Sequence, residues 1–150
     1  QYYEIYYAME CADSFLSDDL QAGIQFSKAD ILVMLRNFVD ALSILHLRYM
    51  ISHRNLNPSN IIKIDTKYKM KEFGTKFDID PEQEKDNQYI APEYFDASLQ
   101  FANIDHGMAD LFSLGMIGLD LCRIDTSRMQ SFNTELSETS ALEYQTGLQY

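Results

Sequence analysis

The sequence is poor in cationic residues and cysteines, and it lacks any long apolar run. Its 150 residues include 12 Lys and Arg against 23 Asp and Glu, so the net charge is −11. Nucleic acids and anionic membrane surfaces are bound by clustered Lys and Arg, so we expect neither as a partner. Cys11 and Cys122 lie far apart without metal or redox spacing, which is typical of a reducing compartment. No stretch approaches the roughly 20 apolar residues of a membrane span, and no secretory signal is recognisable. These absences predict a cytoplasmic protein.

Periodic apolar residues predict two long helices. Ser27, followed three residues later by Asp30, resembles a capping box that would start the first helix. Behind it, apolar residues recur at helical spacing: Ile31, Met34, Leu35, Phe38, Val39, Leu42 and Leu45. The residues Asn55–Pro58 are expected to break this helix into a loop. The second helix is predicted over Met108–Cys122.

Shorter patterns predict a few strands and connecting loops. A strand is expected over Tyr2–Met9, and a short hairpin over Asn60–Ile64 and Lys67–Lys71. Ser14 is placed to cap a short helix that follows it. From Gly74 to Gln88 the chain is polar and poor in aliphatic residues, which is typical of a loop. The pattern predicts an α+β structure that is mainly α-helical.

One segment, from His53 to Asn60, has the spacing of a known catalytic loop. It resembles the H-R-D-L-x-x-x-N loop of eukaryotic protein kinases, whose Asp receives the proton of the substrate hydroxyl. Here Asn55 replaces that Asp, and Asn57 stands where the family usually has Lys. A neutral amide has no useful basicity near neutral pH and cannot act as the general base. The family's scaffold residues remain: His53, Arg54, Leu56, Pro58 and Asn60.

Further motifs follow in the order that the family requires. Glu72-Phe73-Gly74 stands where kinases have D-F-G, and Ala91-Pro92-Glu93 matches A-P-E. The residues 109–115 resemble the start of the long central helix, whose Asp, here Asp110, caps the backbone of the catalytic loop. Upstream, Tyr6–Ala12 resembles the last small-lobe strand running into the hinge. The resemblance implies a partial kinase-like domain over residues 1–123, namely a large lobe preceded by the hinge strand. The small lobe is expected to be absent, and residues 124–150 are expected to form a poorly defined polar tail.

The same resemblance implies positions for a nucleotide and its metal. The hinge and the floor of the adenine pocket would be formed by Met9, Glu10, Ala12 and Ile62. Magnesium would be held by Asn60 and Glu72. A Glu in place of Asp still offers oxygen, but its extra methylene shifts the carboxylate, and small misplacements can cost about a hundredfold in rate. Binding of ATP and magnesium by this fragment is therefore expected to be weak or absent.

Some of these residues also have a purely structural reading. Asp110 could be only a helix cap, and Asn60 braces the loop in the family whether or not metal binds. His46 and His53 lack a second ligand at metal spacing, so we interpret them as scaffold histidines. In the family the loop histidine packs under the D-F-G phenylalanine, which assigns His53 and Phe73 to that contact.

The activation segment lacks the usual switch. Between residues 76 and 88 there is no Ser, Thr or Tyr for phosphorylation to modify. In the family, Arg54 would pair with that phosphate. We hypothesise that Glu82, Glu84 or Asp86 pairs with Arg54 permanently, the alternative being a solvated loop.

Three functions remain open. The first is a catalytically impaired, pseudokinase-like module that binds a protein partner as a scaffold or regulator. The second is a Ser/Thr protein kinase that retains ATP binding and phosphotransfer. The third is a degenerate fragment without independent function.

Overall fold

The described residues form a mainly helical structure with one small sheet, as the sequence predicts. The computed structural model describes residues 9–74, 84, 87–95 and 103–125. Of the predicted strand at 2–9, only Met9 lies within them, outside any strand. The elements are β1 (Ser14–Phe15), α1 (Leu16–Gln21), α2 (Lys28–Ser43), the π-helical turn η1 (Ile44–Arg48), the 3₁₀ turn η2 (Pro58–Asn60), β2 (Ile61–Ile64), β3 (Lys67–Met70), the 3₁₀ turn η3 (Pro92–Phe95) and α4 (His106–Leu121).

Helix α2 begins where the sequence predicts, but it ends earlier. The hydroxyl oxygen of Ser27 accepts a hydrogen bond of 3.1 Å from the backbone N–H of Asp30, which satisfies one unpaired donor of the first turn. The helix runs into η1 and stops at Arg48, and Met50 then adopts a φ of 54°. A left-handed residue cannot continue a right-handed helix. The expectation that Asn55–Pro58 ends this helix is therefore wrong.

The start of α1 also differs from the expectation. Ser14 does not cap the helix, because Ser14 and Phe15 form β1 and pair with Lys63 and Ile62 of β2. The carboxylate of Asp18 instead accepts a hydrogen bond of 3.0 Å from the backbone N–H of Phe15. Pairing with a distant strand thus decides the conformation of Ser14.

The predicted hairpin is confirmed. Strands β2 and β3 pair in an antiparallel register from Ile61–Met70 to Ile64–Lys67, and the sheet order is β1-β2-β3. A two-residue turn joins them, with Asp65 at a φ of 54°, a conformation that Asp tolerates better than most residues.

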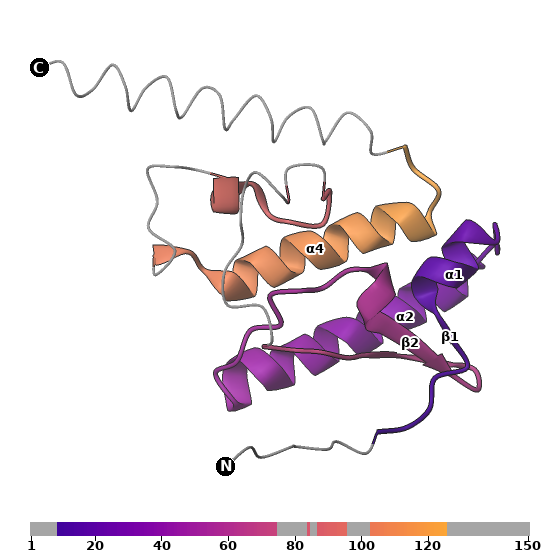
Figure 1. Cartoon of the computed structure of the whole chain (residues 1–150), viewed down its shortest axis with the longest axis horizontal. Coiled ribbons are helices and arrows are strands. Elements are labelled where there is room, and N and C mark those ends of the chain that lie inside the picture. The colour runs from indigo at the N-terminus through magenta and orange to yellow at the C-terminus, as the bar shows by residue number, and fades with distance from the viewer. Residues whose placement is uncertain (1–8, 75–83, 85–86, 96–102, 126–150) are drawn as a thin grey trace, which may run out of the picture.

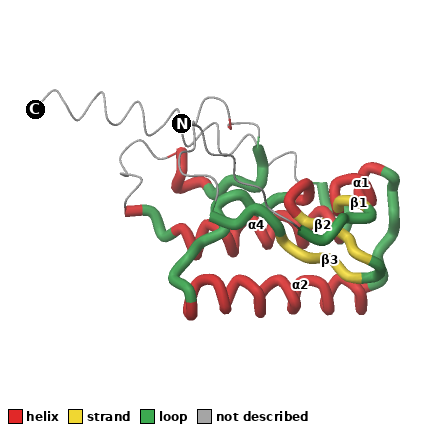
Figure 2. The backbone as a smooth tube through the Cα atoms, turned by 60° about the horizontal axis from the view of Figure 1, so that its bottom comes forward, coloured by secondary structure: helices red, strands yellow, loops and turns green. Residues whose placement is uncertain are grey.

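Helices α2 and α4 lie side by side and run in opposite directions (Figure 1). Helix α4 confirms the predicted second helix. The helices meet at Gly118 and Leu35, where a Cβ on Gly118 would stand 3.5 Å from a methyl group of Leu35, an ordinary van der Waals distance. The core between the helices and the sheet consists of Leu16, Ile31, Met34, Phe38, Leu42, Leu56, Ile61, Leu114, Ile117 and Leu121. Figure 2 shows that the sheet and α1 both lie near the N-terminal end of α2. In the described part of the chain, no helix has the length and apolarity needed to span a bilayer.

Candidate functional site

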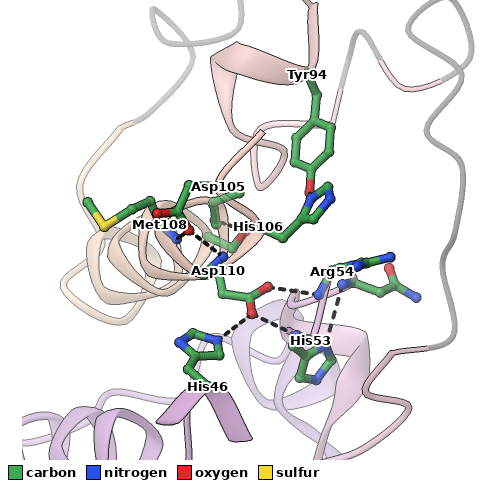
Figure 3. Close-up of polar contacts among 12 residues, drawn as sticks. His46, His53, Arg54, Tyr94, Asp105, His106, Met108 and Asp110 are labelled. Carbon is green, nitrogen blue, oxygen red and sulfur yellow. Dashed lines mark hydrogen bonds and ion pairs between the residues drawn. The ribbon is translucent and has the colours of Figure 1, made fainter. Parts of the chain in front are cut away.

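A single buried carboxylate holds the loop that begins at His53. Asp110 of α4 accepts hydrogen bonds from the backbone N–H of His53 at 2.6 Å and of Arg54 at 2.8 Å (Figure 3). Its Oδ2 also lies 2.8 Å from Nε2 of His46 in η1, the turn that follows α2. Arg54 adopts a φ of 63°, which L-residues rarely adopt without support from their surroundings. Asp110 therefore joins two helical segments and fixes the start of the loop.

The alternative that Asp110 is only a helix cap is wrong. The N-cap of α4 is Asp105, whose Oδ1 accepts hydrogen bonds from the backbone N–H groups of Gly107 at 3.0 Å and Met108 at 3.1 Å. Asp110 lies within the helix and is 1% exposed. Its hydrogen bonds to the loop backbone agree with the role that the kinase resemblance implies.

His53 is fully buried beneath this loop. Burial lowers the pKa of its imidazole, and the nearby charge of Asp110 opposes the shift only in part. Its ring meets that of Phe73 edge-on, with ring centroids 6.4 Å apart. The backbone carbonyl of His53 accepts a hydrogen bond of 3.0 Å from Gly74. The predicted contact between His53 and Phe73 is confirmed, with an edge-on geometry.

The two substituted catalytic positions are hydrogen-bonded to each other. The side-chain amide of Asn57 donates to the side-chain oxygen of Asn55 and to its backbone carbonyl, both at 3.2 Å. The amide oxygen of Asn57 accepts a hydrogen bond of 3.0 Å from the backbone N–H of Ser59 and so caps η2. Asn55 and Asn57, hereafter the asparagine pair, are therefore engaged within the loop itself.

Asn60 braces the same loop. It is 6% exposed, and its amide nitrogen donates a hydrogen bond of 2.8 Å to the backbone carbonyl of Asn55. That bond fixes the amide nitrogen on the loop side, and the amide oxygen remains the group of Asn60 suited to a hard cation. The structural role of Asn60 thus holds without metal.

Glu72, the other expected magnesium ligand, is paired with a neighbouring lysine. Its carboxylate forms an ion pair of 2.8 Å with the ammonium of Lys71, and its backbone has a φ of 59°. Magnesium in phosphotransfer sites is usually held by one or two carboxylates together with the substrate phosphates. Across residues 9–74, 84, 87–95 and 103–125, no three His, Cys, Asp or Glu side chains gather into a metal-binding group. A site built from an amide oxygen, one carboxylate and nucleotide phosphates would not need such a group, so the role of Asn60 and Glu72 in holding magnesium stays a prediction.

The expected adenine-binding residues fall into two environments. Met9 and Glu10 are exposed and Ala12 is half-buried, whereas Ile62 is buried in β2. The carboxylate of Glu10 forms an ion pair with Lys69 of β3. The backbone of the segment is tied to the sheet by the N–H of Asp13, which donates 2.9 Å to the carbonyl of Lys63. The role of these residues in binding adenine stays a prediction.

The predicted pairing of Arg54 with an acidic residue of the activation segment can be followed only in part, because Glu82 and Asp86 lie outside the described residues. The structure does describe Glu84, whose carboxylate accepts a hydrogen bond of 2.9 Å from the side-chain amide of Asn87. A permanent pairing of Arg54 with one of these carboxylates therefore stays a prediction.

A contact between Tyr94 and His106 was not predicted from the sequence. The hydroxyl of Tyr94 lies 2.7 Å from Nδ1 of His106, and the rings stack with centroids 5.8 Å apart. Burial raises the pKa of Tyr94 to about 12. Burial and the nearby Arg54 lower the pKa of His106. The two residues join η3 to the first turn of α4 (Figure 3).

A second unpredicted contact joins Tyr89 to α4. The hydroxyl of Tyr89 donates a hydrogen bond to Asp120, and its backbone carbonyl accepts one of 2.6 Å from the hydroxyl of Ser113. A cavity of about 730 Å³ lies beside this contact and the asparagine pair, lined in part by Asn57, Tyr89 and Asp120. Neither this contact nor that of Tyr94 with His106 leaves a periodic pattern in the sequence. Tyr89 and Asp120 are 31 residues apart, and Tyr94 lies in an irregular segment.

The family follows from comparison with known proteins. The chain matches the model of the protein kinase domain over residues 1–145, and it belongs to that family. Members of the family generally use ATP and magnesium for phosphoryl transfer. No curated protein matches the chain.

Proposed function

We propose that this chain is a catalytically impaired, kinase-like domain that acts by binding a protein partner. The observation that carries the proposal is the hydrogen bond between the side chains of Asn57 and Asn55. Those two positions supply the proton acceptor and a cationic side chain in active relatives. Here they are two neutral amides that satisfy each other.

The chemistry of the asparagine pair supports this proposal. General-base assistance is typically worth roughly 10²–10⁴-fold in rate, and an amide cannot provide it. Phosphoryl transfer is accelerated mainly by positioning and by stabilisation of charge, so a missing lysine removes a second contribution. Because residues that act as a unit are not additive, restoring one of the two should recover little.

The ion pair between Lys71 and Glu72 also supports the proposal. The ammonium of Lys71 lies 2.8 Å from one carboxylate oxygen of Glu72, so a magnesium ion held by the same carboxylate would have a second cation beside it. Like charges repel, so the metal would be bound less tightly than by an unpaired carboxylate. The loss of the base and the poor metal site act in the same direction.

The loop keeps its scaffold although its chemistry is lost. Asp110, His53 and Asn60 are each buried and hydrogen-bonded to the loop backbone or to neighbouring segments. A domain that serves as a binding surface requires this order, whereas it does not require a general base.

A phosphotransfer assay tests the proposal. The purified chain is incubated with γ-labelled ATP, magnesium or manganese, and casein as a general acceptor. We expect no incorporation above that of the Asn60→Ala variant. Incorporation that Asn60→Ala and Glu72→Ala abolish, while the surface variant Asp40→Asn leaves it unchanged, would overturn the proposal in favour of a Ser/Thr protein kinase.

Two further measurements separate the remaining functions. Nucleotide binding is followed by thermal unfolding with ATP, with and without magnesium, and we expect the midpoint to rise by no more than a few degrees. Cooperative unfolding in urea, observed by both circular dichroism and tyrosine fluorescence, is expected of a folded binding module. A non-cooperative transition would instead favour a degenerate fragment.

A further inference from the structure

A groove runs between helix α2 and strand β3, away from the loop that carries the asparagine pair. Two adjoining cavities form it, one of about 390 Å³ and one of about 610 Å³. Both are lined by Asn37 of α2 and by Tyr68 and Lys69 of β3, so they are continuous along the strand. We call this hollow the α2–β3 groove. Figure 2 shows β3 running alongside α2.

The α2–β3 groove has an apolar lining that is unusually accessible. Val33 of α2 and Ile44 of η1 line it and are 60% and 53% exposed, and Phe73 is 51% exposed. Deeper lining residues are Phe26, Met34, Phe38, Ala41, Leu45 and Met70. Apolar side chains that are exposed in a concave surface are typical of a binding site rather than of ordinary surface.

The strand beside the groove has an open edge. In the described sheet β3 is the last strand, and Ile64 and Lys67 face each other across a two-residue turn. In such a hairpin the hydrogen-bonded pairs alternate, and the bond from Lys71 N–H to the Asn60 carbonyl continues the alternation. The N–H and C=O groups of Tyr68 and Met70 therefore point away from β2.

The lining residues show that the groove follows this edge. Successive side chains of a strand point to opposite faces, yet Lys67, Tyr68 and Lys69 all line the larger cavity. A cavity over one face would meet only alternate residues. The groove therefore lies along the strand edge, where an extended segment can pair with the backbone of β3.

Positive charge lines the same edge. Four of the 12 Lys and Arg residues of this acidic chain lie on the hairpin or directly after it: Lys63, Lys67, Lys69 and Lys71. Three of the four line the larger cavity, together with Asp30 and Asp65, and among the described residues lining the smaller one Lys69 alone is charged. Lys63 is paired with Asp19 at 3.2 Å, so Lys67 and Lys69 are the lysines placed to meet a partner.

We propose that the α2–β3 groove binds an extended acidic segment of a partner protein, added as a strand along β3. Alternate side chains of such a segment would be apolar and meet Val33, Ile44 and Phe73, and the side chains between them would be acidic and meet Lys67 and Lys69. This proposal rests on the proposed function in that it names the partner's chemistry, but it places the partner away from the degenerate loop. The ion pair of Glu10 with Lys69 already shows a carboxylate at one of these lysines.

Binding of a labelled peptide tests the proposal. The probe is a fluorescein-labelled peptide of ten residues in which Leu and Asp alternate, and fluorescence anisotropy measures its affinity for the full chain. We expect saturable binding that weakens as the salt concentration rises, and at least tenfold weaker binding of a peptide in which Leu and Lys alternate. Equal binding of both peptides would overturn the proposal.

Matched variants locate the site. Val33→Asp and Lys67→Glu should each weaken binding of the acidic peptide about tenfold, whereas Glu10→Gln, which removes the competing carboxylate, should strengthen it. Leu32→Asp is the control for Val33→Asp, because Leu32 is 59% exposed on the same helix and lines neither cavity. Arg36→Glu is the corresponding control for charge. Controls that weaken binding as much as the groove variants would overturn the proposal.

Further outcomes distinguish a second copy of the chain from a partner peptide, and failure of the groove proposal from failure of the proposed function. Concentration-dependent dimerisation of the chain, lost in Val33→Asp but retained in Leu32→Asp, would assign the groove to a second copy and overturn the proposal. If the chain binds no peptide and transfers no phosphate, only the proposal for the groove is overturned. If it transfers phosphate and still binds the peptide, only the proposed function is overturned.

Discussion

The carboxylate of Asp110 binds the backbone N–H groups of His53 and Arg54, which precede it in the chain by 57 and 56 residues. The same carboxylate meets His46, so one buried side chain connects α4, η1 and the loop. These hydrogen bonds hold the start of the loop through its backbone and do not depend on which side chains stand at positions 55 and 57.

We predict that Asp110→Asn strongly destabilises the chain. The asparagine keeps one acceptor oxygen but places an amide N–H₂ against groups that are themselves donors. The free energy of unfolding should fall by roughly 2–4 kcal/mol, as expected when charged hydrogen bonds are lost in a buried site. Urea unfolding measures the change. Asp40→Asn, on the exposed side of α2, is the control and should change it by no more than about 0.5 kcal/mol.

We predict that Asn57 stabilises the loop through its cap and its bonds to Asn55. Asn57→Ala removes these bonds and should lower the free energy of unfolding by about 1–2 kcal/mol. Asn57→Asp keeps the acceptor for Ser59 N–H and should cost less. Urea unfolding of both variants decides the point, and an alanine variant as stable as the parent would show that these hydrogen bonds contribute nothing.

Stability should fall as the pH falls below neutrality. Burial lowers the pKa of both His53 and His106 in the folded chain. The unfolded chain, with histidines near 6.5, then binds more protons than the folded one below that pH. The stabilisation is complete above about pH 6.5 and is lost as the pH falls toward the folded pKa values, by at most about 1.4 kcal/mol per pH unit for each histidine.

Unfolding experiments between pH 5.0 and 7.5 measure this dependence. The His106→Gln variant should show a shallower decline than the parent, since one of the two contributions is gone. An unfolding free energy that stays constant over this range, or rises on acidification, would contradict the assignment of two neutral histidines.

We predict that the contact between α2 and α4 depends on Phe38. This side chain is 2% exposed in the core, so Phe38→Ala should lower the free energy of unfolding by about 3–5 kcal/mol through the cavity it leaves. Val39→Ala, at the neighbouring exposed position, should cost about 0.5 kcal/mol or less. Equal effects of the two substitutions would mean that α2 does not bury the face described.

The sequence predicts the long elements well because their signals are local. The apolar period and Ser27 were sufficient to find α2, and the two runs around Asp65 were sufficient for the hairpin. The errors fall where a distant partner decides. Ser14 forms a strand because β2 lies beside it, and the helix ends at Arg48 because the chain must turn at Met50 to reach Asp110.

The candidate site could be predicted only in part. The motif spacing identified Asn55, Asn57 and Asp110, since a known family supplies the meaning of each position. Nothing in the sequence indicated that the two asparagines bond to each other or that Lys71 pairs with Glu72. The contacts of Tyr94 with His106 and of Tyr89 with Asp120 were missed for the same reason.

The sequence alone determined the family and the absence of a carboxylate at the position of the general base, because both are matters of residue identity and spacing. The tertiary structure alone decided which groups those residues meet. It engages Asn55 with Asn57, buries Asp110 beneath the loop and, among the described strands, places β3 with its lysines at the end of the sheet. The bonds to Asp110 join segments more than 50 residues apart, and the bond between Asn55 and Asn57 depends on the backbone shape of an irregular loop, so both follow from the folded structure and not from a local pattern.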